Sequence, residues 1–179
     1  MLPRETIAAF DVFLQKQGLD LEAVVVGGAA LALLGVTHRQ TRDVDVLHPD
    51  LPQAVAEAAR EFAAVQRASG QFVADDWLNN GPSQLKEILP EGWMARSQVA
   101  FSGEALTFLV LGRGDLLKSK LFSLCDRATD LGDCLALAPS ETEIGEAESW
   151  VALQDAHPDW PEHVRRTLDD LRRRLRHGI

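Results

Sequence analysis

The chain has 179 residues and a formal net charge of −9, and 46% of its residues are hydrophobic. These proportions are typical of a globular protein that is long enough to bury a substantial core. No apolar run approaches the roughly 20 residues that span a bilayer, and the start lacks the apolar stretch of a signal peptide. The acidic balance disfavours a broad electrostatic grip on duplex DNA. We therefore expect a cytoplasmic protein with no membrane segment.

The first half of the chain alternates helical and strand patterns. Residues 5–17 have the apolar spacing of a helix, and residues 21–26 form a β-branched run that predicts a buried strand. The segment 29–35 favours a helix that ends at a glycine. Residues 41–48 alternate with period two, which predicts a second strand, and 51–65 is an amphipathic helix.

The second half begins with a segment rich in turn residues, from 75 to 97, which we expect to be a loop with about one helical turn. Residues 98–111 predict a hairpin that turns at Ser102 and Gly103. Three helical stretches follow, at 115–138, 140–156 and 161–177. The order of these elements indicates an α/β (α+β) fold with a small sheet and a helical C-terminal third.

Two features of the last third are interpreted as structural, and the second also has a functional alternative. Cys125 and Cys134 lie far from any histidine cluster, so we interpret them as buried thiols in a reducing compartment. The arginine-rich run 164–178 is typical of a solvated helix face with basic residues near its C-terminus. A docking site for RNA or for an acidic partner is the alternative.

Two glycines, Gly27 and Gly28, stand where the strand 21–26 gives way to a helix. Glycine lets the backbone adopt positive φ and lets another group approach closely, because it has no Cβ. Backbone N–H groups at such a turn can point at an anion. The alternative is a tight turn that serves packing alone.

Asp43 and Asp45 are separated by one residue on the predicted strand. Residues i and i+2 of a strand point to the same face, so the two carboxylates would lie side by side. Adjacent like charges are unfavourable unless a cation neutralises them, and Mg²⁺ prefers one or two carboxylates together with substrate phosphates. Arg39 and Thr41 continue the same alternation. A solvated edge strand is the alternative.

Together, the glycine pair and the following R-x-T-x-D-x-D resemble the signature of the minimal nucleotidyltransferase superfamily, which has the DNA polymerase β-like fold with a small mixed sheet flanked by helices. The resemblance implies that Gly27 and Gly28 hold a triphosphate, with Arg39 and Thr41 beside it. It implies that Asp43 and Asp45 hold Mg²⁺ or Mn²⁺. We accordingly expect a nucleotidyltransferase-like core at 1–112 and a helical region at 113–179 packed on it.

The resemblance extends past this motif. D-W-L-N at 76–79, D-L-L-x-x-K and D-R-x-x-D-L-x-D are similar to a nucleotidyltransferase-like family of unknown function. The chain also resembles nucleotidyltransferase toxins of toxin–antitoxin pairs, which carry a Lys, an Arg and an acid on a downstream helix. Lys120, Arg127 and Asp130 fit that arrangement, with Lys120 as a possible phosphate contact. A set of salt bridges on a helix face is the alternative.

The chain departs from the superfamily at one position. Members that catalyse transfer usually carry a third carboxylate on a later strand, but residues 105–111 contain no acid. Glu104, Asp115, Asp130 and Asp133 lie nearby in the sequence, and Asp130 is the substitute that we favour.

The sequence therefore supports three hypotheses. The first is a Mg²⁺-dependent enzyme that moves a nucleotidyl group from an NTP to an RNA or protein acceptor, as a toxin with a cognate antitoxin would. The second is a catalytically degenerate member that binds nucleotide or a partner protein. The third is an interaction domain in which the glycines form a turn and the aspartates lie on the surface.

Overall fold

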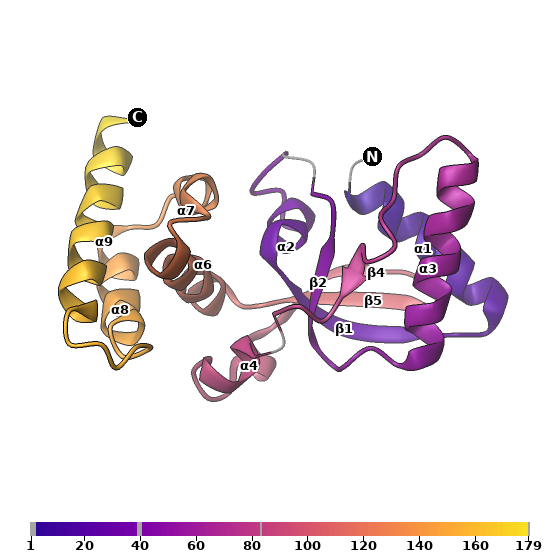
Figure 1. Cartoon of the computed structure of the whole chain (residues 1–179), viewed down its shortest axis with the longest axis horizontal. Helices are drawn as coiled ribbons and strands as arrows, with labels where there is room; N and C mark the ends of the chain where they lie inside the picture. The colour runs from indigo at the N-terminus through magenta and orange to yellow at the C-terminus, as the bar shows by residue number, and fades with distance from the viewer. Residues whose placement is uncertain (1–2, 39–40, 83, 179) are drawn as a thin grey trace. The chain divides into compact units, whose positions relative to one another are not determined.

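The computed structural model describes residues 3–38, 41–82 and 84–178. By internal contacts the chain divides into two compact units. The first comprises Met1–Glu87 and Gly92–Leu111, and the second comprises Ile88–Glu91 and Gly112–Ile179. Each unit has its own arrangement of elements (Figure 1).

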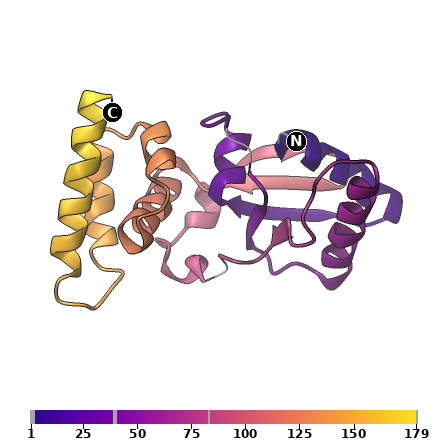
Figure 2. The same ribbon diagram turned by 45° about the horizontal axis from the view of Figure 1, so that its top comes forward.

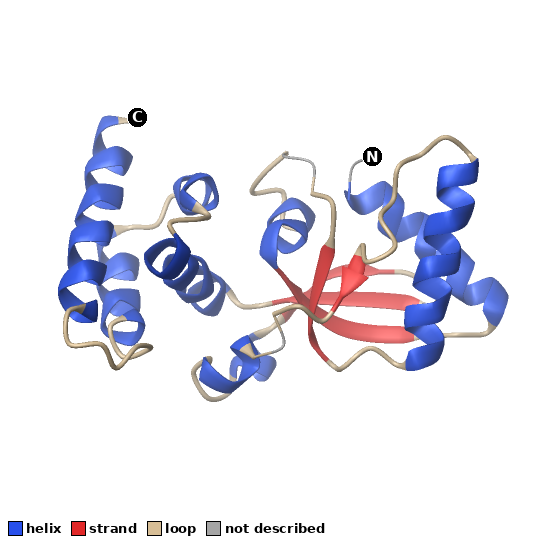
Figure 3. Cartoon of the chain, in the orientation of Figure 1, coloured by secondary structure: helices blue, strands red, loops and turns tan. Residues whose placement is uncertain are grey.

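The first unit is built on a mixed sheet whose described strands have the order β3-β2-β1-β5-β4 (Figure 3). β1 pairs with β2 in antiparallel and with β5 in parallel fashion. β2 and β3 are parallel, and β4 and β5 form an antiparallel hairpin. The bounds of the strands are Leu21–Val26 (β1), Val44–His48 (β2), Leu78–Asn79 (β3), Gln98–Ser102 (β4) and Leu106–Val110 (β5).

Helices α1 (Pro3–Gln17), α2 (Gly27–Leu33) and α3 (Gln53–Ala68) share one apolar core with the strands (Figure 2). The helical spacing of apolar residues predicts this burial. Phe10 of α1 packs against Phe62 of α3 with ring centroids 5.3 Å apart and meets the edge of Trp77 at 5.0 Å. Two short helices, α4 (Leu85–Ile88) and α5 (Trp93–Arg96), lie between β3 and β4 in the chain.

A buried carboxylate fixes the turn of the β4–β5 hairpin. Asp11 of α1 accepts hydrogen bonds from the backbone N–H groups of Ala105 and Leu106 at 2.8 Å. A Cβ on Gly103 would come within 2.3 Å of the same carboxylate. The hairpin is therefore held to α1 by charge-assisted hydrogen bonds as well as by apolar packing.

The second unit is helical in its described part, with α6 (Arg113–Arg127), α7 (Leu131–Leu137), α8 (Glu141–Val151) and α9 (Trp160–His177). A capping box opens α8: the Ser140 hydroxyl accepts the Glu143 N–H, and the Glu143 side chain accepts the Ser140 N–H. Most arginines of α9 pair with acids. Arg172, for example, lies 2.7 Å from Glu148 and 2.9 Å from Asp169. Most of these pairs are exposed, which fits the interpretation of the basic run as a solvated helix face.

The mixed sheet with its helices confirms the predicted α+β class, and the strand at 21–26 is as predicted. The predicted hairpin is present, but Ser102 ends β4 and the turn comprises residues 103–105. Cys125 and Cys134 are free and buried, as predicted, and burial raises the pKa of each thiol to about 12. None of the described helices is long and apolar enough to cross a membrane.

Three predicted boundaries were wrong. The strand expected from residue 41 starts at Val44. The helix expected over 115–138 is two helices, because Ala128 and Asp130 adopt positive φ and interrupt it. The segment expected to be loop contains β3, whose two residues are too few to produce a period-two pattern.

Candidate functional site

The glycine turn and the second aspartate of the D-x-D motif meet at the end of β1. The antiparallel register pairs Val26 with Asp45, so Gly27 lies next to that aspartate. Gly27 has a φ of +72°, which other residues rarely adopt, and a Cβ there would lie 2.6 Å from Asp45 Oδ2. Another residue would be strained by this positive φ, and its Cβ would force the Asp45 carboxylate to move. Two motifs that are 18 positions apart in the sequence therefore form one site.

Asp45 faces away from the apolar core of the first unit. Its neighbours Val44 and Val46 are buried in that core, so strand alternation directs the half-buried Asp45 side chain to the opposite face of the sheet. The predicted contrast between valines turned inward and a carboxylate turned outward is therefore present at this position.

Asp43 is placed differently from the prediction. It is exposed and precedes β2, and Thr41 lies in the same loop, so neither residue shares a strand face with Asp45. A side-chain turn orients Asp43 instead. Thr41 Oγ1 donates to the Asp43 carbonyl oxygen at 2.7 Å, lies 3.1 Å from Asp43 Oδ1 and accepts the Asp43 N–H at 3.2 Å. Arg39 lies outside the described residues.

Asn79 is a neighbour of Asp45 that the sequence analysis missed. The parallel pairing of β2 and β3 places the two residues side by side, and side chains of paired residues point to the same face. Asn79 Oδ1 accepts the Gly81 N–H at 2.7 Å. A Cβ on Gly81 would lie 2.8 Å from Asn79 Oδ1 and 4.0 Å from Asp45 Oδ1. The D-W-L-N motif contained this residue, but no pattern distinguished it.

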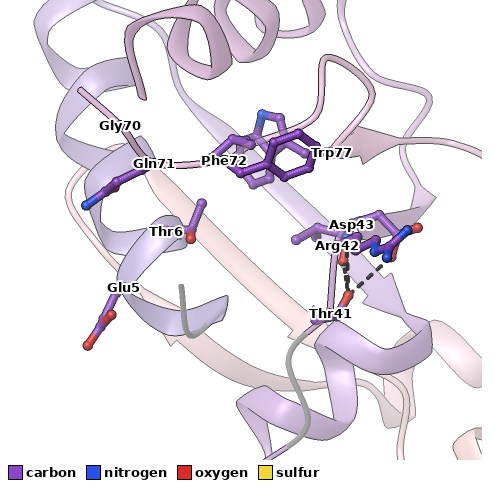
Figure 4. Close-up of a pocket in the computed structure, with 11 residues that line it drawn as sticks. Glu5, Thr6, Thr41, Arg42, Asp43, Gly70, Gln71, Phe72 and Trp77 are labelled. Carbon is purple, nitrogen blue, oxygen red and sulfur yellow. Dashed lines mark hydrogen bonds between the residues drawn. The ribbon is translucent and has the colours of Figure 1, made fainter. Parts of the chain in front are cut away.

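A cavity of about 710 Å³ is lined in part by Asp43 (Figure 4). It lies between the start of α1, the loop before β2 and the segment 70–77, and its wall includes Thr6, Asp43 and Phe72. Phe72 is 80% exposed and presents an aromatic ring near Trp77. Among the described residues, Asp43 lines this cavity but Gly27 and Asp45 do not. The volume is that of a small-molecule site.

Lys120 lies in the second unit and is enclosed by acids. Its buried ammonium group is 2.7 Å from Asp133 Oδ2 and 3.2 Å from Asp130 Oδ2. Burying a lysine requires such partners. The charge that was predicted to meet a phosphate thus forms ion pairs within the protein.

The predicted helix face shared by Lys120, Arg127 and Asp130 is not present. α6 ends at Arg127, and Asp130 lies beyond the break as the N-cap of α7. Arg127 is exposed and donates to Ser123 at 2.9 Å. The turn between the two helices, and not helical periodicity, brings Asp130 to Lys120.

The described residues contain no group of three or more His, Cys, Asp or Glu that could hold a metal ion. Of the proposed substitutes for the third carboxylate, Glu104 is exposed in the hairpin turn, and Asp115 and Asp133 are buried on helices of the second unit. β5 carries no acid. Asp45 is the acid that lies at the glycine turn, whereas Asp43 lines the cavity.

Comparison with known proteins identifies the family of the chain. No curated protein and no solved structure matches the chain. Residues 6–138 match the family described as "Nucleotidyltransferase of unknown function (DUF6036)". This match covers both glycines, both aspartates and Asn79, and it extends well past half of the chain. The protein thus belongs to this nucleotidyltransferase family.

Proposed function

We propose that the protein is a nucleotidyltransferase that depends on a divalent cation and moves a nucleotidyl group from an NTP to a hydroxyl of an RNA or protein acceptor. The observation that carries this proposal is the approach of Gly27 to Asp45, which joins the glycine turn and the D-x-D motif into one site. A Cβ on Gly27 would lie 2.6 Å from Asp45 Oδ2, so glycine lets the carboxylate approach the turn closely.

The side chains at this site fit Mg²⁺ or Mn²⁺. Asp43 and Asp45 offer only oxygen, which hard cations prefer, and Mg²⁺ is commonly held by one or two carboxylates plus substrate phosphates. The missing side chains of Gly27 and Gly81 leave open the space around the Asp45 carboxylate that a Cβ would fill. When bound, the cation would supply positive charge to the phosphates of the NTP.

Residues of the chain would carry out the other parts of the reaction. In the transfer, the acceptor oxygen forms a bond to the α-phosphorus, the bond from that phosphorus to the bridging oxygen breaks, and pyrophosphate leaves. Gly27 and Gly28 would hold the triphosphate through their backbone N–H groups. Asp43 lines the cavity, so an acceptor hydroxyl there would pass its proton to the Asp43 carboxylate. Thr41 orients that carboxylate.

A second candidate is a family member that binds NTP but does not transfer it. The specific observation in its favour is the lack of any acid on β5 and of a three-acid group among the described residues. In either case, a role as a toxin with an antitoxin partner is the extension that the resemblance suggests.

The test of the proposal is calorimetric titration of Mg·NTP into the wild type and the isosteric variants Asp43→Asn and Asp45→Asn. We expect each variant to bind at least roughly tenfold more weakly, because a lost carboxylate removes a cation ligand and its charge. Asp20→Asn is the control, since Asp20 is an exposed acid of the same unit before β1. Unchanged affinity in Asp45→Asn would refute the metal site.

Turnover separates the two candidates. Wild-type protein is incubated with labelled NTPs and cell extract, and the label is followed into RNA and into protein. Transfer that is lost in Asp45→Asn supports the enzyme and identifies the class of acceptor. Binding of NTP without transfer to any acceptor supports the second candidate.

A further inference from the structure

We infer that the side-chain oxygen of Asn79 is a third ligand of the divalent cation, in place of the carboxylate that β5 lacks. This inference rests on the proposed function and assigns a residue that neither the D-x-D motif nor the sequence pattern identifies. It makes the β2–β3 pair, and not β5, the source of the third oxygen.

The sheet register brings the two side chains together. Asp45 and Asn79 are paired residues of adjacent parallel strands, so their side chains leave the sheet on the same face. Asn79 Oδ1 and Asp45 Oδ1 both lie within 4.0 Å of the same point, the position that a Cβ on Gly81 would take. A side chain at 81 would therefore crowd the Asn79 and Asp45 oxygens, and glycine avoids this.

The chemistry of an amide oxygen suits this role. Asn carbonyl oxygens are among the ligands of hard cations, and they add a ligand without adding a negative charge. Asn79 Oδ1 already accepts the Gly81 N–H at 2.7 Å. A carbonyl oxygen has two lone pairs, so the same atom can accept that hydrogen bond and bind a cation. The bond to Gly81 then holds the amide in one orientation.

The competing explanation is that Asn79 only forms the turn to Gly81. Asp also accepts hydrogen bonds in such turns, so Asn79→Asp keeps the turn and adds a negative charge. Binding of Mn²⁺ to the protein without nucleotide, measured by electron paramagnetic resonance, is the first readout. If residue 79 is a ligand, Asn79→Asp should bind Mn²⁺ at least tenfold more tightly than the wild type, and Asn79→Ala should bind it at least tenfold more weakly.

Direct ligation is tested with a soft metal. Thiolates select soft cations, so Asn79→Cys should bind Cd²⁺ with a thiolate-to-cadmium absorption band in the ultraviolet that the wild type lacks. Asp76→Cys is the matched control, because Asp76 is exposed and only three residues upstream. Adding Asp45→Asn to Asn79→Cys should weaken Cd²⁺ binding at least tenfold.

The outcomes separate this inference from the proposed function. If Asp45→Asn abolishes Mn²⁺ binding but Asn79→Ala and Asn79→Asp bind like the wild type, the metal site stands and Asn79 is only a turn residue. A cadmium band of equal strength in Asn79→Cys and Asp76→Cys also overturns the inference. If Asp45→Asn has no effect on Mn²⁺ binding, the proposed function itself fails.

Discussion

The chain contains two groups of acids that look alike in sequence but differ in what they surround. In the second unit, Asp130 and Asp133 enclose the ammonium group of Lys120 at 3.2 and 2.7 Å. In the first unit, Asp45 lies against Gly27 and beside Asn79, at positions where the lack of a Cβ leaves space. Asp130 and Asp133 neutralise a lysine of the protein, whereas we propose that Asp45 binds a divalent cation.

This difference separates acids that neutralise a buried lysine from the acid of the proposed metal site. Lys120 is 5% exposed, and its two partners satisfy a charge that would otherwise be costly to bury. Asp45 is flanked by Gly27 and Gly81, where a Cβ would lie 2.6 Å and 4.0 Å from its carboxylate oxygens. The acids around Lys120 stabilise the fold. A glycine beside an acid does not by itself mark a ligand site, because Gly103 lies against Asp11, which holds the β4–β5 hairpin. At Asp45 the D-x-D motif is the additional feature.

The largest expected effect is that of Lys120→Met, which tests whether Lys120 and its two acids stabilise the fold. Removing the buried ammonium leaves Asp130 and Asp133 without their cation, which should reduce the free energy of unfolding by about 3–5 kcal/mol. Urea denaturation measures this loss, and Lys118→Met, on the same helix but only half-buried, is the control. A variant of wild-type stability that had lost nucleotidyl transfer would instead make Lys120 catalytic.

Gly27→Ala should have an intermediate effect on stability and a specific effect on binding. The left-handed backbone costs a residue with a Cβ about 1–2 kcal/mol, and the Cβ would also displace the Asp45 carboxylate. Gly35→Ala is a matched control, because Gly35 has a similar φ of +70° and nothing within 4 Å of its Cβ position. We expect similar losses of thermal stability in both variants but weaker Mn²⁺ binding in Gly27→Ala alone. Equal binding by the two would mean that the glycine turn serves the fold only.

The smallest effect concerns an exposed ion pair, which sharpens the contrast with buried Lys120. The Arg113 guanidinium, 2.6 Å from Glu143, and the capping bonds to Ser140 lower the pKa of Glu143 from 4.5 to about 2. Because the pKa is lower in the folded state, the stabilisation is complete above pH 4.5 and is lost as the pH falls towards 2.

In Glu143→Gln the melting temperature should therefore decline less steeply as the pH falls over this range. The difference in the free energy of unfolding should be less than about 1 kcal/mol, since the pair is accessible to solvent. Thermal unfolding at several pH values measures it. Parallel pH profiles for the variant and the wild type would show that Glu143 contributes no pH dependence.

Much of the first unit was predictable because its signals are local. The apolar spacing of Ile7, Phe10 and Leu14 predicts α1, and all three are fully buried. The β-branched run before Gly27 predicts β1 in the same way. β3 was not predictable, because two residues carry no periodicity, and this is why Asn79 was overlooked. The break between α6 and α7 was missed because Ala128 and Asp130 are not residues that usually adopt positive φ.

By itself, the sequence determined the α+β class and the residue types at the proposed site, because strand alternation and a glycine turn are encoded within a few neighbouring positions. Only the tertiary structure decided which of these residues meet. Pairing of β1 with β2 places Gly27 against Asp45, and pairing of β2 with β3 adds Asn79. The turn after α6 gives Lys120 to Asp130 and Asp133. Contacts between strands and between helices depend on register and chain direction, which no local pattern specifies.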